Sequence, residues 1–88
     1  MASRTVVVGS KVGLHARPAA IVAQAAAAYD EDITVRLADA EPGDGVDAGS
    51  SMMLMTLGAV AGARVTVESD NGDAVDEVAA LIEKDLDA

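Results

Sequence analysis

Cysteine is absent from the 88-residue sequence, and so are phenylalanine and tryptophan. Without cysteine the chain offers no disulfide, no zinc–thiolate site and no thiol nucleophile, which fits a reducing compartment such as the cytosol. Lysine occurs only twice, and Asp and Glu outnumber Lys and Arg by 15 to 6. Because sequence-independent binding to nucleic acid needs Lys and Arg on the phosphates, DNA and RNA are not expected partners.

Long apolar runs are also missing. A membrane-spanning helix needs roughly 20 consecutive apolar residues, and the most apolar stretch, 19–29, is rich in alanine and only as long as one globular helix. No charged-then-apolar leader opens the chain. We therefore expect a soluble, cytoplasmic protein that folds as a single domain over residues 1–88.

The acidic composition has two possible origins. A net charge of −9 with few lysines and few bulky apolar residues is typical of proteins that stay soluble in very high salt, where self-repulsion is screened. A GC-rich genome, whose codons favour Ala, Gly, Val and Asp, would give a similar composition. Folding stability that rises from low salt into molar KCl would support a halophilic source, whereas a flat or falling curve would support codon bias.

The predicted elements follow the order β-α-β-β-α-β-α. Four strands are predicted from β-branched or alternating apolar residues, at 6–8, 33–37, 46–48 and 63–69. Three helices are predicted from helix-forming residues and helical spacing, at 16–28, 50–57 and 73–86. Residues 38–45 contain one proline and two glycines and predict a loop. These elements predict an α+β domain with helices on one face of an antiparallel sheet.

The one histidine, His15, stands immediately before the first predicted helix. The first backbone N–H groups of a helix, here those of Ala16 and Arg17, have no partner within the helix, and the positive end of the helix dipole favours an anion. The Arg17 guanidinium could pair with a phosphoryl oxygen, and Pro18 makes the turn rigid. A neutral imidazole nitrogen is a competent nucleophile near neutral pH. A histidine near a helix start is usually only an exposed cap. The evidence for phosphoryl transfer is therefore the combination of the histidine with the first-turn amides, Arg17 and Pro18.

Two segments stand out as motifs: segment 13–19 reads Gly-Leu-His-Ala-Arg-Pro-Ala, and segment 50–58 reads Ser-Ser-Met-Met-Leu-Met-Thr-Leu-Gly. Both resemble motifs of the HPr family, the phosphocarriers of the phosphoenolpyruvate-dependent sugar phosphotransferase system. Segment 13–19 is similar to the family's active-site motif at every position, and segment 50–58 is similar to its short helix that opens with serine and ends in Leu-Gly. The resemblance covers essentially the whole chain. It implies an open-faced β-sandwich, in which three helices cover one face of a four-stranded antiparallel sheet.

The resemblance also implies a relay. Enzyme I, charged by phosphoenolpyruvate, would phosphorylate His15 on Nδ1, and His15 would pass the group to an EIIA domain that feeds sugar uptake. Arg17 would be the electrostatic partner of the phosphoryl group, and no metal or cofactor would be needed. The acidic turn 30–32 is interpreted as solvated charge. The chain would then be a monomeric carrier with transient partners, regenerated within the relay, rather than a true enzyme.

Ser50 matches a serine that a dedicated HPr kinase phosphorylates in several bacterial relatives. A phosphate there would add about −1.5 to −2 charge at a helix start. Ser50 could instead be a plain N-cap that accepts a backbone N–H. The family residue after this serine is usually bulky and apolar, whereas Ser51 stands here and competes for the cap. This departure weakens the assignment of a kinase site.

The helix predicted at 50–57 carries three methionines: Met52, Met53 and Met55. So short a helix cannot bury them together with two leucines on one face. With Leu54 and Leu57 directed inward, the methionines are expected to be partly exposed and to dock successive partners, because methionine adapts to different surfaces. Leu14, next to the histidine, is expected to extend this patch.

The chain departs from its relatives in two further places. Many of them carry lysines on the exposed face of the first helix, where this chain has Gln24 and Ala27. Foreign Enzyme I or EIIA proteins are therefore expected to bind poorly, which a cross-species transfer assay would test. The loop 38–45 is longer than the family's tight turn, with no functional explanation from the sequence.

Three other functions stay open. The carrier could serve a nitrogen-related phosphotransferase system or a dihydroxyacetone kinase instead of sugar uptake. A regulatory relative would act by binding enzymes or transcription factors, but versions without transport function lack the histidine that this chain keeps as His15. A small ligand-binding domain of the same topology would not need His15 beside Arg17.

Overall fold

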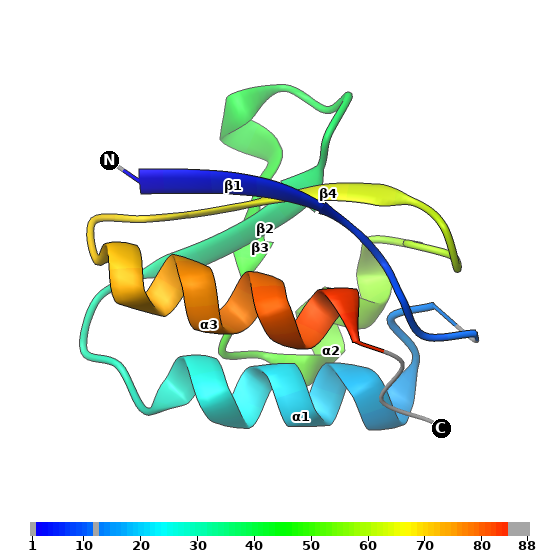
Figure 1. Ribbon diagram of the computed structural model, residues 1–88, viewed down its shortest axis with the longest axis horizontal. Coiled ribbons are helices and arrows are strands. Elements are labelled where there is room, and N and C mark those ends of the chain that lie inside the picture. The colour runs from blue at the N-terminus through cyan, green and yellow to red at the C-terminus, as the bar shows by residue number, and fades with distance from the viewer. Residues whose placement is uncertain (1, 12, 85–88) are drawn as a thin grey trace.

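The computed structural model describes residues 2–11 and 13–84 (Figure 1). Its elements in chain order are β1 (Ala2–Val7), α1 (Ala16–Ala27), β2 (Ile33–Leu37), the 3-10 turn η1 (Pro42–Asp44), β3 (Val46–Asp47), α2 (Ser51–Thr56), β4 (Arg64–Ser69) and α3 (Gly72–Glu83). The predicted order of strands and helices is confirmed. The 3-10 turn lies within the predicted loop 38–45 and interrupts none of the other elements.

The four strands form one antiparallel sheet in the order β1-β4-β2-β3. In Figure 1 all three helices lie on the same side of this sheet, so the predicted open-faced sandwich is confirmed. The register places Val6 opposite Val65 and Val35 opposite Val67. Because directly opposed residues share a face, the strand valines gather on the side that the helices cover.

Two predicted boundaries are wrong by more than one residue, for physical reasons. β1 begins at Ala2 instead of residue 6, because Ala2 to Arg4 pair with β4 despite their weak strand preference. α3 ends at Glu83 instead of residue 86, because the backbone of Lys84 is extended, with φ −75° and ψ 152°. Leu86, predicted to face the core, lies outside the described residues.

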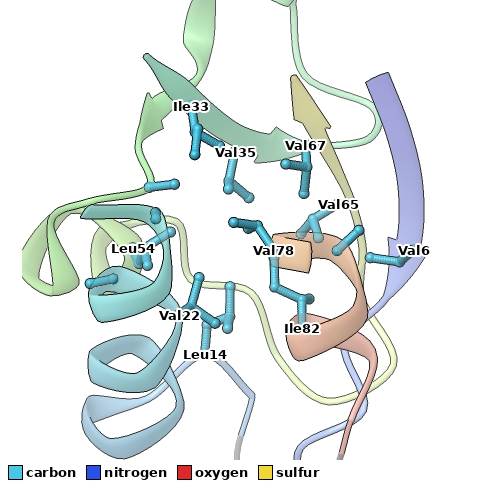
Figure 2. Packing of buried hydrophobic residues seen from close by; sticks show 14 of the residues in the cluster. Val6, Leu14, Val22, Ile33, Val35, Leu54, Val65, Val67, Val78 and Ile82 are labelled. Atoms are coloured by element: carbon cyan, nitrogen blue, oxygen red, sulfur yellow. The ribbon is translucent and has the colours of Figure 1, made fainter. Parts of the chain in front are cut away.

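Among the described residues, the fully buried core is built from valine, alanine, leucine and isoleucine, and the half-buried Tyr29 packs against it. Figure 2 shows Val22 of α1, Leu54 of α2, and Val78 and Ile82 of α3 pointing toward the strand valines. Val22, Leu54 and Val78 are fully buried. Each such side chain contributes about 1.5–3 kcal/mol of hydrophobic free energy. Buried alanines of α1 and α3 fill this core beside the larger aliphatic side chains, so a chain without phenylalanine or tryptophan still forms a continuous apolar core.

The open face of the sheet carries polar side chains. Thr5 and Thr66 share a hydrogen bond of 2.8 Å between their hydroxyls. The Arg36 guanidinium forms an ion pair with Glu68, 3.0 Å from Nε to Oε1, and its Nη1 donates to the Ala40 carbonyl at 3.1 Å. Arg36 thereby ties the long loop 38–45 to the sheet, which gives this loop a structural anchor.

Candidate functional site

His15 is the N-cap residue of α1. Its backbone is extended, with φ −89° and ψ −172°, and its carbonyl accepts the first helical hydrogen bond from the Ala19 N–H at 2.8 Å. The imidazole is exposed and makes no capping bond. Ala16 and Arg17 follow as the first two helical residues, and Pro18 has no N–H to satisfy. The α1 start therefore directs two backbone amides outward beside an exposed imidazole.

Arg17 is exposed and forms no ion pair with the part of the chain that the structure describes. Arg4 and Arg36 differ in this respect. Arg4 reaches Asp76 at 3.8 Å and Glu83 at 3.7 Å, and Arg36 pairs with Glu68. The Arg17 guanidinium thus keeps its charge uncompensated in the same turn as His15, where it can receive an anion.

The loop before His15 is held by backbone contacts from two other parts of the chain. The Gly9 N–H donates to the Ile82 carbonyl of α3 at 3.0 Å, and the Leu14 N–H donates to the Ala59 carbonyl at 2.9 Å. Gly13 adopts φ +74°, and a Cβ there would overlap the Ala59 carbonyl oxygen. Gly13 is a positioning residue that sequence reasoning quoted within the motif without giving it a role. The presence of Gly13 in the motif 13–19 was the sequence signal that could have pointed to this role.

The prediction that Leu14 extends an exposed docking patch is wrong. Its side chain is 5% exposed and belongs to the hydrophobic core. Figure 2 shows it near Val22, inside the molecule. The physical reason is the hydrogen bond from its N–H to Ala59, which turns the backbone so that the side chain enters the core beneath α1.

The exposure predicted for the α2 methionines (Met52, Met53 and Met55) is confirmed. Their exposed fractions are 71%, 42% and 40%, whereas Leu54 between them is fully buried. Two further large apolar side chains are exposed: Val7 of β1 at 48% and Val60 at 66%. The Val60 Cα lies beside Gly13. Sequence reasoning missed Val60 because a single valine in a loop has no periodic pattern. Apart from Val7, the large exposed apolar side chains of the described residues thus come from α2 and the segment after it.

Ser50 is the N-cap residue of α2, and its Oγ accepts the Met53 N–H at 3.3 Å. Ser51 is the first helical residue, so the predicted competition between the two serines is resolved in favour of Ser50. Gly58 ends the helix with φ +67°, as expected of a glycine after a helix.

The acidic turn 30–32 is exposed, and the Glu31 carboxylate accepts a hydrogen bond from Asn71 at 3.0 Å. Among residues 2–11 and 13–84, no group of three or more His, Asp or Glu side chains has the arrangement of a metal site. No described helix has the length and apolar character needed to cross a membrane.

Comparison with known proteins gives a consistent result. The PTS-HPr family model, described as "PTS HPr component phosphorylation site", matches residues 2–84. The phosphocarrier protein HPr of Streptomyces coelicolor is 43% identical over 70 residues, covering 80% of this chain and 72% of that protein. HPr of Mycoplasma capricolum is 31% identical over 87 residues, covering 99% and 93%. The crystal structure of HPr-C-His from Thermoanaerobacter tengcongensis matches with a TM-score of 0.83 at 31% identity, covering 100% and 98%. The chain therefore belongs to the HPr family of phosphotransferase-system phosphocarriers.

Proposed function

We propose that the chain accepts a phosphoryl group on His15 from Enzyme I, charged by phosphoenolpyruvate, and passes it to an EIIA domain for sugar uptake. The observation that carries this proposal is the arrangement at the start of α1. An exposed imidazole, an unpaired guanidinium and two first-turn amides lie within three consecutive residues, His15 to Arg17. No other helix start in the described residues combines these groups.

Phosphoryl transfer to His15 would need only a nucleophilic nitrogen and groups that attract the phosphoryl oxygens. The Nδ1 lone pair of neutral His15 attacks phosphorus, and the bond between phosphorus and the donor group breaks as the donor takes back its electron pair. The Arg17 guanidinium and the Ala16 and Arg17 amides would attract the phosphoryl oxygens through charge and the helix dipole. Such contacts are solvent-exposed and reversible, so the group can be transferred onward. We infer a carrier rather than an enzyme.

Partners would dock on the exposed apolar side chains of α2 and of the segment that follows it. The α2 methionines and Val60 form this surface, with Val60 beside the histidine loop. α1 borders it with the exposed Gln24 and Ala27, which carry no charge. Docking would therefore depend on apolar contact with Enzyme I and EIIA more than on lysine–carboxylate pairing. We propose transient binding by a cytoplasmic monomer.

Regulation by an HPr kinase at Ser50 has weaker support. Its hydroxyl oxygen already serves as the acceptor that caps α2, and a serine follows where relatives carry a bulky apolar residue. We propose that Ser50 acts chiefly as a cap. Label from ATP on Ser50 in the presence of an HPr kinase would contradict this assignment.

Incubation with cognate Enzyme I and labelled phosphoenolpyruvate tests the main proposal. We expect acid-labile, alkali-stable label on the wild type and none on His15→Ala, which changes an exposed side chain and leaves the core intact. Arg17→Ala should slow labelling by about tenfold or more, as expected when a charged partner of the phosphoryl group is lost. Label on His15→Ala would contradict the proposal. Incubating the labelled carrier with EIIA, a nitrogen-related acceptor and a dihydroxyacetone kinase separates the three relays.

A further inference from the structure

The methionines of α2 are the most exposed oxidisable side chains that the structure describes. The chain contains no cysteine and no tryptophan. Its one tyrosine, Tyr29, is half-buried, and its hydroxyl is hydrogen-bonded to Glu77. Exposed thioethers react with hydroperoxides, whereas buried ones are protected. A two-electron oxidant would therefore meet Met52, at 71% exposure, and then Met53 and Met55.

The fold of α2 does not depend on these three side chains. Leu54 is fully buried and fixes the helix to the core. The Ser50 hydroxyl caps its first turn, and the Thr56 hydroxyl donates to the Met53 carbonyl at 2.6 Å near its end. Oxidation of a core methionine disrupts packing, but here the sulfur atoms lie outside the core. The helix should keep its place while its outer surface changes.

We propose that the α2 methionines are a reversible oxidation site that switches off phosphoryl transfer, an inference that rests on the proposed function. The thioether sulfur attacks one oxygen of a hydroperoxide, and the O–O bond breaks. That oxygen becomes the sulfoxide oxygen, and the other leaves as water or an alcohol. The sulfur loses two electrons, and methionine sulfoxide reductases return them with release of water.

The inhibition follows from the polarity of the product. A sulfoxide is a strong hydrogen-bond acceptor, and burying it against an apolar partner surface without a donor carries a desolvation penalty. His15 and Arg17 are not changed by the reaction. Oxidation would thus act on docking and leave the phosphoryl acceptor intact.

The test compares each protein with itself before and after hydrogen peroxide, which catalase removes before Enzyme I is added. We expect oxidised wild type to accept label at least about tenfold more slowly. Methionine sulfoxide reductases should restore the starting rate. Peptide mass mapping should show one added oxygen at each α2 methionine, first at Met52. Circular dichroism and urea unfolding should be the same before and after oxidation.

The matched control is the triple variant M52L/M53L/M55L, which keeps an apolar surface and retains Met1. Whatever its starting rate, that rate should be unaffected by peroxide. The variant M52Q/M53Q/M55Q, which places polar amides there, should transfer slowly without peroxide. An unchanged rate for wild type carrying three mapped sulfoxides would overturn the proposal, and so would equal loss in the leucine variant or loss that reductases do not reverse. Failure of the untreated wild type to accept label would count against the proposed function instead.

Discussion

The starts of α1 and α3 lie at opposite ends of the helix pair, and their polar side chains differ in how they are paired. α1 ends where α3 begins (Figure 1), and the side chains of Tyr29, Glu31 and Asn71 at that end have hydrogen-bond partners. Tyr29 donates to Glu77 at 2.6 Å, and Asn71 donates to Glu31 while its Oδ1 accepts the Asp73 and Ala74 amides at 3.0 and 3.3 Å. At the other end, the side chains of His15 and Arg17 have no hydrogen-bond or ion-pair partner among the described residues.

The capped start of α3 contributes to stability, whereas the uncapped start of α1 leaves groups available to bind an anion. Asn71 and His15 occupy the same N-cap position of their helices, yet only Asn71 satisfies first-turn amides. A missing cap costs about 1 kcal/mol, so α1 is less stable at its start than it could be. The backbone contacts of Gly13 and Leu14 with Ala59 hold the loop in place of a cap. Unpaired groups at the start of α1 are the ones that an incoming anion can use.

Substituting a capping residue for the histidine should have the largest effect. In His15→Asp the carboxylate can accept first-turn amides and interact with the helix dipole. We expect complete loss of phosphoryl acceptance together with a gain of about 1 kcal/mol in unfolding free energy. Labelling with Enzyme I and urea denaturation measure the two quantities. If His15→Asp had a lower unfolding free energy than the wild type, the missing cap would not be what limits the stability of α1.

Disturbing the loop that presents the histidine should have the next largest effect. Gly13→Ala combines a positive φ with overlap of the Ala59 carbonyl and should lower unfolding free energy by about 2–4 kcal/mol. Gly58→Ala has a similar φ, but no atom lies within 4 Å of the added Cβ, so its cost should be about 1 kcal/mol. Urea denaturation compares the pair. Equal losses would mean that the contact with Ala59 is unimportant.

Removing the cap at the paired end should affect stability alone. Asn71→Ala deletes the acceptor for two α3 amides and the donor to Glu31, with an expected loss of about 1 kcal/mol. The rate of labelling by Enzyme I should stay at the wild-type value, because the substitution lies at the opposite end of the helix pair from His15. A slowed transfer at equal folded fraction would show that the two ends are coupled.

The smallest effect concerns Tyr29. The hydrogen bond to the Glu77 carboxylate, with smaller contributions from burial and from the charges of Glu77 and Asp73, raises the pKa of Tyr29 above its ordinary value of 10.0. A raised folded-state pKa means that the neutral phenol is favoured in the fold. This stabilisation is fully present below pH 10 and is lost as pH rises through the folded pKa.

Absorbance titration can follow Tyr29 directly, because it is the one tyrosine and tryptophan is absent. Glu77→Gln should lower the pKa of Tyr29 toward its ordinary value. Glu83→Gln, which removes a charge at the other end of α3, should leave it unchanged. Equal shifts in both variants would indicate a general effect of net charge instead of the specific hydrogen bond.

The sequence by itself determined the order of the elements, the helix that Gly58 ends and the residues of the histidine motif. These features depend on local preferences, such as β-branched alternation, helix-breaking glycine and the spacing of polar and apolar residues. The exposure of the α2 methionines could also be predicted, because one short helix has room to bury only part of its apolar side chains.

Only the tertiary structure decided which side chains around the histidine are accessible. The Ala59 carbonyl, far along the chain, accepts the Leu14 N–H and lies against Gly13. Leu14 therefore enters the core, and Val60 is the exposed apolar side chain beside the histidine loop, where Leu14 was expected. Arg4 pairs with acidic residues of α3, and Arg36 pairs with Glu68 of β4, whereas Arg17 forms no ion pair within the described residues. Which arginine is paired likewise depends on strands and helices that meet only in the fold. Around the histidine, burial and ion pairing are set by contacts between distant segments, which the local sequence pattern there does not reveal.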